Sequence, residues 1–371
     1  MRLAVLWSEL SGYLDACFRA AMDGPGEDSG GRGTNDLYVA YQKPGAQSPF
    51  DSDLFDWFPH AYAHDGIVDD DRLWRELEDF APEVVLVSSW NHAGYLKMMR
   101  RLPKDTIRVL CMDNPWLGTP RQYLGVLSAP FFLAPRFDAA FVAGERQAQF
   151  ARRLGFAEDR VWQGVLTCDH GPFDAVCRAR GGKLADSFCY VGRLSSEKGV
   201  DLLVEAYRRY RAGAARPWPL SVYGAGPLEH LLRGEDGISL KGFTQPGDLP
   251  RALAEHDCLL VPSHYEAWGI AIHEAAAAGL SILSTAAAGA TVHLVRDGFN
   301  GWVVPTGDVA ALADAMGWYA GLPAARRRRM GENANRLSGQ FTPRLWAENL
   351  FTHVARLRAR AGTGTGTGTG T

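Results

Sequence analysis

The feature that most constrains this chain is a repeated alternation of short apolar runs with longer, partly polar stretches. The first half carries strand-length apolar runs at 2–7, 37–41, 84–87, 107–112 and 137–142. A second series of such runs follows at 188–191, 220–223, 238–240, 258–261 and 281–283. Strands that alternate with helices form mostly parallel sheets with helices on both faces. The sequence therefore predicts an α/β fold of two doubly wound, Rossmann-like domains.

The positions of the two series also predict how the chain is divided. A length of 371 residues is sufficient for two hydrophobic cores. The predicted parts are an N-terminal domain (1–168), a linker (169–186), a C-terminal domain (187–342), a helix that crosses back to the first domain (343–360) and a disordered Gly-Thr tail (361–371). Because parallel strands end at one edge of a sheet, the loops of both domains are expected to face a central cleft.

Composition excludes several classes of protein. The net charge of −3 argues against a nucleic-acid partner bound by bulk positive charge. The six cysteines form no CxxC pair and lie mainly in apolar runs, which predicts reduced thiols in a cytoplasmic protein. The chain opens directly on a strand with no signal peptide, and no apolar run reaches the roughly 18 residues of a membrane span.

Four segments depart from the alternation. Residues 23–36, rich in Gly, Asp and Ser, are expected to be a mobile loop, and residues 51–64 an irregular loop on the acceptor side. The most apolar segment, 123–137, contains Pro130 and Pro135 and is interpreted as a helix packed on its own domain. A peripheral contact with the inner face of a membrane is the alternative. The run 326–329, four arginines, is interpreted as a solvated helix face, with a phosphate or anionic lipid as the alternative partner.

Two carboxylates, Glu266 and Glu274, flank the start of a predicted helix that follows the apolar run 258–262. Glu266 falls in the loop, and Glu274 lies about a turn and a half into the helix. The free N–H groups of a helix start can receive a phosphate. The segment is therefore predicted to hold a sugar, a diphosphate and a ribose in a row. The alternatives are the acid and base of a glycoside hydrolase and a surface helix with Glu in its first turns.

Two cations lie in the loop after the strand 188–191. Arg193 and Lys198 are five residues apart, just before a predicted helix. Cations beside a helix start bind phosphate through charge-assisted hydrogen bonds. The alternative is a solvated basic loop. A glycoside hydrolase has no diphosphate to neutralise, so these cations count against that class.

Two further loops follow strands of the second series. Gly224-Ala225-Gly226 offers G-x-G, but Glu229 stands where a dinucleotide fingerprint has its third glycine, which favours a tight turn before a helix. The segment 241–244 can present backbone groups and the ring of Phe243 to a nucleobase. A plain turn is the alternative.

In this order, the motifs resemble glycosyltransferase family 4, a group of retaining nucleotide-sugar transferases with the GT-B fold. The matching elements are Tyr190-Val191-Gly192-Arg193-Leu194, Glu197-Lys198-Gly199, Gly224-Ala225-Gly226-Pro227-Leu228, Gly242-Phe243, the E-x7-E pair that begins Glu266-Ala267-Trp268-Gly269, and the segment 297–304. The resemblance covers residues 189–319 and extends more loosely to 137–150 of the first domain.

The resemblance implies roles for particular residues. Arg193 and Lys198 would neutralise the diphosphate, so that neither a metal nor a cofactor is expected. Glu274 would accept the ribose hydroxyls, and Glu266 would face the sugar. The predicted catalytic residues are Arg193, Lys198, Glu266, Asp113 and His92. The predicted donor-binding residues are Gly12, Gly192, Gly224, Gly242, Phe243, Ala267, Trp268, Gly269, Ile270 and Glu274, with the N–H groups of 268–270 on the phosphates.

The first domain departs from the family in two places. Only Ser11-Gly12 is present where many members have two glycines, and Met112-Asp113-Asn114 stands where many have a histidine. His92, at the end of the preceding strand, is the other candidate for the acceptor side. The predicted activity is transfer of a sugar from a nucleotide-diphospho-sugar to an unidentified acceptor hydroxyl. The alternatives are a nucleotide-sugar epimerase or hydrolase on the same fold, and a catalytically idle binding protein.

Overall fold

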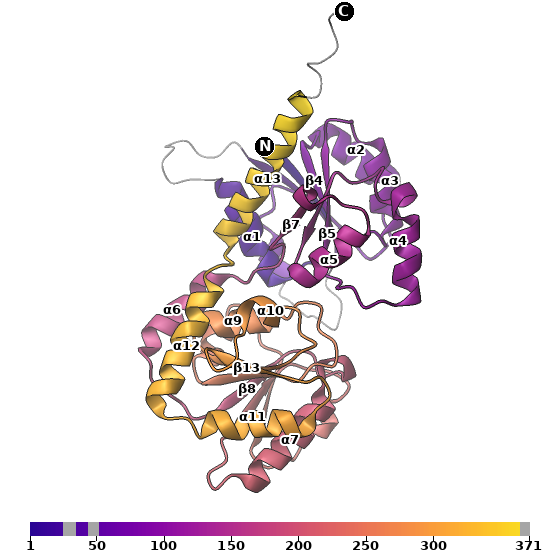
Figure 1. The fold of residues 1–371 in the computed structure, drawn as a ribbon. Coiled ribbons are helices and arrows are strands. Elements are labelled where there is room, and N and C mark those ends of the chain that lie inside the picture. Colours follow the sequence, from indigo (N-terminus) through magenta and orange to yellow (C-terminus); the bar gives the residue numbers. More distant parts are fainter. Residues whose placement is uncertain (25–34, 44–51, 364–371) are drawn as a thin grey trace, which may run out of the picture. The chain divides into compact units, whose positions relative to one another are not determined.

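The computed structural model describes residues 1–24, 35–43 and 52–363. The described chain forms two compact units, one built from 1–24, 35–43, 52–166 and 343–363, the other from 167–342. Residues 25–34 and 364–371 lie outside the described residues, so the mobile loop and the disordered tail stay predictions. Figure 1 shows a sheet with covering helices in each unit.

The first unit is built on a parallel sheet. Its described strands, in spatial order, are β3 (His60–His64), β2 (Asp36–Gln42), β1 (Arg2–Trp7), β4 (Val84–Val87), β5 (Ile107–Met112), β6 (Ala139–Val142) and β7 (Val161–Gln163). Each neighbouring pair is parallel. The chain moves outward from β1 to β3 and then returns to β4 on the other side, which confirms the predicted doubly wound topology.

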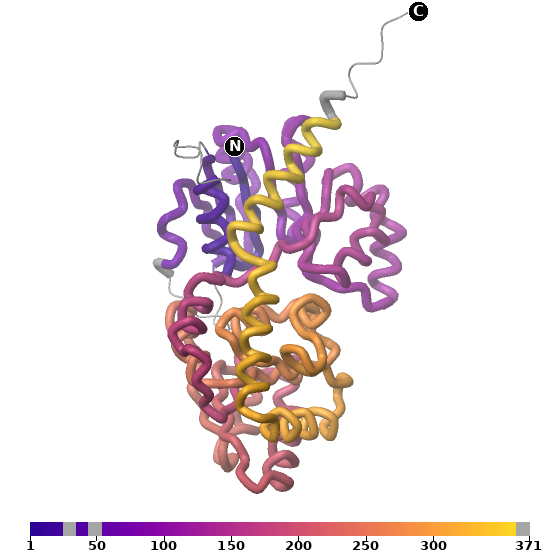
Figure 2. The backbone as a smooth tube through the Cα atoms, turned by 60° about the vertical axis from the view of Figure 1, so that its left-hand side comes forward, coloured from indigo at the N-terminus to yellow at the C-terminus, as the bar shows by residue number. Residues whose placement is uncertain are grey.

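Helices cover both faces of this sheet. They are α1 (Gly12–Asp23), α2 (Asp70–Phe80), α3 (Ala93–Arg101), α4 (Pro120–Phe132), α5 (Glu145–Arg153) and α13 (Pro343–Thr363), with short 3₁₀ turns η1 (Ser52–Phe55) and η2 (Glu158–Arg160). Helix α13 lies beside α1, as Figures 1 and 2 show. The indole N–H of Trp346 donates to the carbonyl of Val165 at 3.0 Å, and its ring meets Phe18 edge-on. These contacts confirm the prediction that the last helix returns to the first domain.

The second unit repeats the plan. Its described strands, in spatial order, are β10 (Ile238–Gly242), β9 (Leu220–Tyr223), β8 (Phe188–Val191), β11 (Cys258–Val261), β12 (Ser281–Thr285) and β13 (Gly301–Val304), all parallel. Its helices are α6 (His170–Arg180), α7 (Val200–Gly213), α8 (Leu249–Leu253), α9 (Ile270–Ala277), α10 (Thr291–Leu294), α11 (Val309–Ala320) and α12 (Ala324–Ser338), with 3₁₀ turns η3 (Ser196–Lys198) and η4 (Glu229–Leu231). Helix α11 packs beside α7, and α6 and α12 pack on α9.

Two predictions about irregular segments are changed by the structure. The expectation of an irregular loop up to His64 is wrong, because β3 pairs with β2 in parallel there. Only Tyr62 and His64 of this edge strand are buried, so its apolar signal is too weak to recognise. The segment predicted as a linker, 169–186, contains helix α6, which the division into compact units assigns to the second unit.

The arginine run is a solvated face, as predicted, at Arg326, Arg328 and Arg329, but not at Arg327. Arg327 is 8% exposed. Its guanidinium pairs with Asp186 at 2.6 Å and with the buried Asp257 at 3.2 Å, and Arg180 also pairs with Asp257. Breaking one partner of such a buried network leaves an uncompensated charge. One arginine of the run therefore ties α12 to the core of its unit.

Two properties bear on the cellular setting. The six cysteines are free thiols, as predicted, and all but Cys177 are buried. Among the described residues, no helix combines the length and the apolar character needed to cross a bilayer.

Candidate active site

A cavity of about 700 Å³ lies at the carboxyl ends of β8, β9 and β11. Strand β8 is where the strand order of the second sheet reverses, and ligands of doubly wound sheets bind at that position. The cavity walls include these predicted site residues: Gly192, Arg193, Lys198, Gly224, Phe243, Glu266, Gly269, Ile270 and Glu274. Residues from four separate loops thus meet in one place.

Lys198 and Glu266 form an ion pair in the cavity wall. The ammonium of Lys198 contacts Oε2 of Glu266, and the two side chains are 19% and 17% exposed. Their charges cancel in this state. If an anionic ligand reached Lys198, the lysine would therefore exchange the Glu266 carboxylate for the anionic group of the ligand.

Arg193 is held at the mouth of the same cavity. Its guanidinium pairs with Glu197 at 3.2 Å, and the hydroxyl of Ser195 donates to Glu197 at 2.7 Å. That hydrogen bond is the main reason why the pKa of Glu197 lies below its ordinary value. The carbonyl of Glu197 accepts hydrogen bonds from the N–H groups of His264 and Tyr265, at 2.9 and 3.0 Å. The cationic loop is thereby joined to the loop that carries Glu266.

Glu274 differs from the other charged groups of the cavity. It lines the cavity from the second turn of α9. Its carboxylate has no hydrogen bond or ion pair within the described part of the chain. Burial raises its pKa from 4.5 to about 7. A partly buried carboxyl without an internal partner is available to a ligand.

The amino terminus of α9 lies between the two carboxylates. The helix begins after Gly269, which has φ +96, and Ile270 lines the cavity. First-turn N–H groups have no intrahelical acceptor. Trp268 does not line the cavity: its side chain is 2% exposed and packs against His293 and Phe341. Its predicted contribution can therefore involve only its backbone.

Two glycines permit the close approach of the cavity loops. A Cβ on Gly199 (φ +68) would lie 2.1 Å from the carbonyl oxygen of Pro262, and one on Gly224 (φ +144) would lie 1.9 Å from that of Gly192. Only glycine fits at these positions. The predicted tight turn at Gly224 is thus a crossing of two loops, and a 3₁₀ turn, η4, follows it in place of a helix.

The far wall of the cavity is partly aromatic. Phe243, 37% exposed, lines it with Thr244 just beyond β10. Tyr190 lines it as well, and its hydroxyl donates to the carbonyl of Arg193 at 2.8 Å. Tyr190 was not among the predicted site residues, because an aromatic residue in a strand has the pattern of a core residue. Gly242 and Ala267 are adjacent in sequence to lining residues but are not in the wall.

A buried histidine of α9, His273, anchors the helix to backbone groups of two neighbouring segments. The Nδ1 atom of His273 accepts from the N–H of Cys168 at 3.1 Å, so its Nε2–H donates to the carbonyl of Ser338 at 3.1 Å. Burial lowers its pKa to about 4, which keeps the ring neutral. His273 precedes Glu274, so this contact positions the helix turn that carries the carboxylate.

The remaining predicted residues belong to the first unit, at the carboxyl edge of its sheet. Gly12 begins α1 after β1, His92 precedes α3 after β4, and Asp113 follows β5 directly. The ring of His92 stacks on Tyr95 with 3.9 Å between centroids, and its buried Nδ1 has no partner. Burial lowers the pKa of His92. The structure describes each unit by itself, so a role of these residues beside the donor site stays a prediction.

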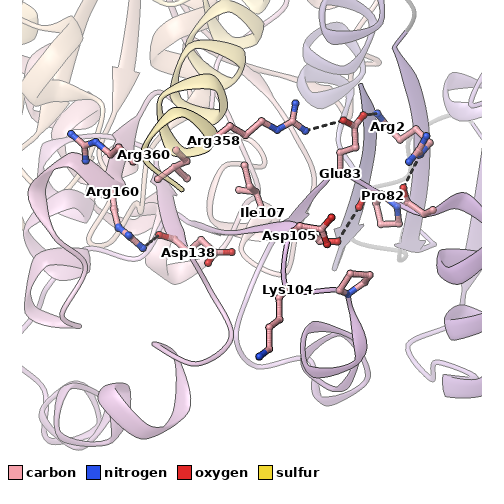
Figure 3. Close-up of a pocket in the computed structure, with 14 residues that line it drawn as sticks. Arg2, Pro82, Glu83, Lys104, Asp105, Ile107, Asp138, Arg160, Arg358 and Arg360 are labelled. Carbon is pink, nitrogen blue, oxygen red and sulfur yellow. Dashed lines mark hydrogen bonds and ion pairs between the residues drawn. The ribbon is translucent and has the colours of Figure 1, made fainter. Parts of the chain in front are cut away.

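A second cavity, of about 650 Å³, lies at the opposite edge of the first sheet, and nothing in the sequence indicated it (Figure 3). Its charged lining residues mostly form ion pairs and hydrogen bonds within the same unit. Arg358 pairs with Glu83 at 3.0 Å, and Arg160 donates to the carbonyl of Asp138 at 3.2 Å. Ligands of parallel sheets bind at the carboxyl ends of the strands, not at this edge.

In the part of the chain that is described, no group of three His, Cys, Asp or Glu side chains could hold a metal ion.

Comparison with known proteins also points to the second unit, which carries the cavity with the predicted donor-binding residues. Residues 185–337 match the family model described as Glycosyl transferases group 1. The amylovoran biosynthesis glycosyltransferase AmsK of Erwinia amylovora is 33% identical over 183 residues, which is 42% of this chain and 44% of that protein. A glycogen synthase of Mycobacterium tuberculosis is 32% identical over 197 residues, covering 50% and 46%. An exopolysaccharide phosphotransferase of Streptomyces coelicolor is 29% identical over 254 residues, covering 64% and 26%.

Solved structures define the fold class. HepE of Anabaena, crystallised with UDP, aligns over 96% of this chain and 100% of its own with a TM-score of 0.70 at 14% identity. The sucrose-phosphate synthase of Thermosynechococcus elongatus aligns over 97% and 100% with a TM-score of 0.67 at 18% identity. The fold is therefore GT-B, as predicted. The chain spans less than half the length of the curated relatives named above.

Proposed function

We propose that this chain is a glycosyltransferase that moves a sugar from a nucleotide-diphospho-sugar to an acceptor hydroxyl. One observation carries the proposal. A single cavity at the switch point of the second sheet holds two cations, a helix amino terminus and a carboxylate that has no partner within the described parts of the chain. This set matches the charge sequence of a nucleotide-diphospho-sugar, and it lies inside the segment that matches the group 1 model.

Donor binding would rearrange the ion pair in the cavity. The diphosphate would form ion pairs with Lys198 and Arg193. Glu266 would then lose its contact with Lys198 and could face the sugar. The N–H groups of 268–270 would hold the phosphates, and Glu274 would accept the ribose hydroxyls. Among the described residues, Glu274 has no hydrogen-bond partner. A ribose hydroxyl that binds it would therefore displace water and would not break a hydrogen bond within the protein.

The reaction would be retaining, in the manner of glycosyltransferase family 4. The bond between the anomeric carbon and the phosphate oxygen breaks, and a bond from the acceptor oxygen to the same face of that carbon forms. The acceptor proton passes to the released phosphate oxygen. His92 and Asp113 are the candidate groups for the acceptor side. Product analysis by NMR tests this step, since an inverted anomer would refute it.

The transfer would need neither a metal nor a cofactor, because Arg193 and Lys198 supply positive charge where the leaving group develops negative charge. Turnover should persist after exhaustive treatment with EDTA. Loss of turnover that Mg²⁺ or Mn²⁺ restores would refute metal independence and leave the donor site itself intact. The free cysteines are consistent with a cytoplasmic location.

A thermal-shift screen with UDP-, GDP-, ADP- and dTDP-sugars tests the donor class, because a ligand of the folded state raises the melting temperature. UDP-sugars come first, since HepE was crystallised with UDP, with UDP and glucose, and with UDP-glucose. No shift with any of them would refute the proposal. Steady consumption of the donor without an acceptor would indicate an epimerase or hydrolase. Donor binding without any turnover would indicate an idle binding protein.

A further inference from the structure

Helix α4 of the first unit buries little of its apolar surface, although it is among the most apolar helices of the chain. A helix that covers a sheet normally packs an apolar stripe on it. Within Pro120–Phe132, Ala129 is the one buried residue. The expectation that this segment packs as a helix on its own domain is met through Val126, Ala129 and Leu133, but the larger apolar side chains of the helix are left exposed.

The exposed side chains of α4 form one continuous stripe. Leu124, Leu127 and Phe131 are 67%, 72% and 82% exposed, and their spacing of three and four residues places them on one face. Tyr123 is 57% exposed beside this stripe. We name these four side chains the α4 stripe. Single exposed apolar residues are ordinary, but a contiguous apolar surface marks a contact with a partner or a membrane.

The segment that carries the α4 stripe has only basic charges. No acidic residue occurs between Asp113 and Asp138, and Arg121 is the one charged residue of α4 itself. At the start of the helix, Arg153 lies over the ring of Trp116, 5.0 Å from its centroid, and Trp116 meets Tyr123 edge-on. At the far end, the exposed Arg100 lies close enough to Arg136 to lower its pKa, although burial is the larger cause.

We propose that the α4 stripe docks this protein on an anionic lipid bilayer, with α4 lying in the plane of the interface. The apolar side chains would enter the boundary between headgroups and acyl chains, and the surrounding arginines would meet anionic headgroups. Trp116 and Tyr123 would lie at headgroup depth, where amphipathic aromatic rings are favoured. The proposal is independent of the proposed enzymatic activity.

A bilayer fits these observations better than a second copy of the chain. Two copies that met through the α4 stripe would bring the basic groups at the two ends of α4 together, and like charges at an interface repel. Of the four side chains in the stripe, only Tyr123 carries a hydrogen-bonding group, its hydroxyl. A fluid, anionic surface needs no matching groove and satisfies both the apolar and the basic groups.

Vesicle co-sedimentation of the full chain tests the proposal. Wild-type protein should bind vesicles of phosphatidylcholine with 30% phosphatidylglycerol at least roughly tenfold more tightly than pure phosphatidylcholine vesicles, and 0.5 M salt should weaken this binding. The double variant Leu127→Glu with Phe131→Glu should lose at least about tenfold in affinity. Arg121→Glu should reduce binding to the anionic vesicles and leave the weak binding to neutral ones unchanged.

The matched control is Ile67→Glu, which changes another exposed apolar residue of the same unit, 87% exposed and outside the α4 stripe. It should bind as wild type does. All the substituted residues are exposed, so thermal unfolding should remain within about 2 °C of wild type. Absence of wild-type binding to anionic vesicles would overturn the proposal, as would equal losses in the control and the double variant. A wild-type dimer that the double variant dissociates would assign the stripe to a second copy instead.

Discussion

The two sheets have the same doubly wound plan, yet the polar groups at their carboxyl edges differ in whether they have hydrogen-bond partners. At the edge of the second sheet, Glu274 has no partner among the described residues, and Lys198 pairs with another cavity group, Glu266. At the edge of the first sheet, the Tyr95 hydroxyl donates to the carbonyl of Trp7 at 3.0 Å and meets Nε2 of His64 at 2.7 Å.

This difference separates a ligand site from a polar core. Buried polar groups are normally satisfied within the protein. The His64 and Tyr95 cluster follows that rule, apart from the unpartnered Nδ1 of His92. The cavity of the second unit departs from it at Glu274, where a ligand could complete the hydrogen bonding. Variants of the second edge should therefore change ligand binding and turnover, whereas variants of the His64 and Tyr95 cluster at the first edge should mainly change stability.

The largest expected effect is on folding of the second edge. Gly199→Ala should destabilise the protein by more than about 3 kcal/mol, because a Cβ at φ +68 would meet the Pro262 carbonyl at 2.1 Å. Gly213→Ala, at the end of α7 with open space around it, should be neutral or stabilise by about 0.5 kcal/mol. Chemical denaturation measures both, and equal stabilities would show that the loop crossing tolerates a side chain.

The next effect is on turnover. Lys198→Ala should lower kcat/KM for sugar transfer by at least about a hundredfold, because a charge-stabilising donor is lost. The exposed Lys183 is the matched control, and Lys183→Ala should leave the rate unchanged. Steady-state kinetics with the donor found in the thermal-shift screen measures both. Wild-type rates in Lys198→Ala would remove this lysine from the proposed site.

Glu274 should show a dependence of stability on pH. Because its folded pKa of about 7 lies above the ordinary 4.5, the folded state holds a proton that the unfolded state has lost between these values, and stability falls as pH rises through this range. Glu274→Gln should therefore raise the free energy of unfolding at pH 8 by about 1–3 kcal/mol, but not at pH 4, while weakening donor binding.

The exposed residue Glu332 provides the control for that measurement. Glu332→Gln should follow the wild-type stability at both pH values. A variant Glu274→Gln that is less stable than wild type at pH 8 would contradict the raised pKa and indicate a partner for the carboxylate.

The smallest effect is expected at the first edge. Tyr95→Phe should cost about 1–2 kcal/mol of stability, because the Trp7 carbonyl and His64 lose a partner. Tyr41→Phe should cost less, since no hydrogen bond of its hydroxyl is present among the described residues. Neither variant should change the affinity for the donor. A large loss of donor affinity in Tyr95→Phe would break the contrast between the two edges.

Much of the fold could be predicted from local patterns, because a strand buried on both faces is a continuous apolar run. The run 258–261 and the run 84–87 were recognised in this way, and both are central strands. The edge strand β3 was missed because only two of its residues are buried. Helix α6 was missed because glycines at both ends of its segment resemble those of a linker.

The predicted donor site was recognisable because its loops each carry a local motif. The order of Arg193, Lys198, Glu266 and Glu274 along the chain, together with the strand before each loop, was enough to predict that they converge. Tyr190 and His273 could not be predicted, because a strand aromatic and a helical histidine have the pattern of core residues. Their partners, the Arg193 carbonyl and the N–H of Cys168, are backbone groups that sequence patterns do not mark.

By itself, the sequence determined the α/β class, the two sheets and the residue types around the proposed donor site, since these follow from short-range periodicity and from motifs within single loops. Only the tertiary structure decided which groups have partners. It showed that Arg327 is buried in an ion-pair network, that Glu274 has no partner in the part of the chain described by the structure, and that the α4 stripe is exposed. Burial and pairing depend on segments far apart in the chain, so no local pattern can specify them.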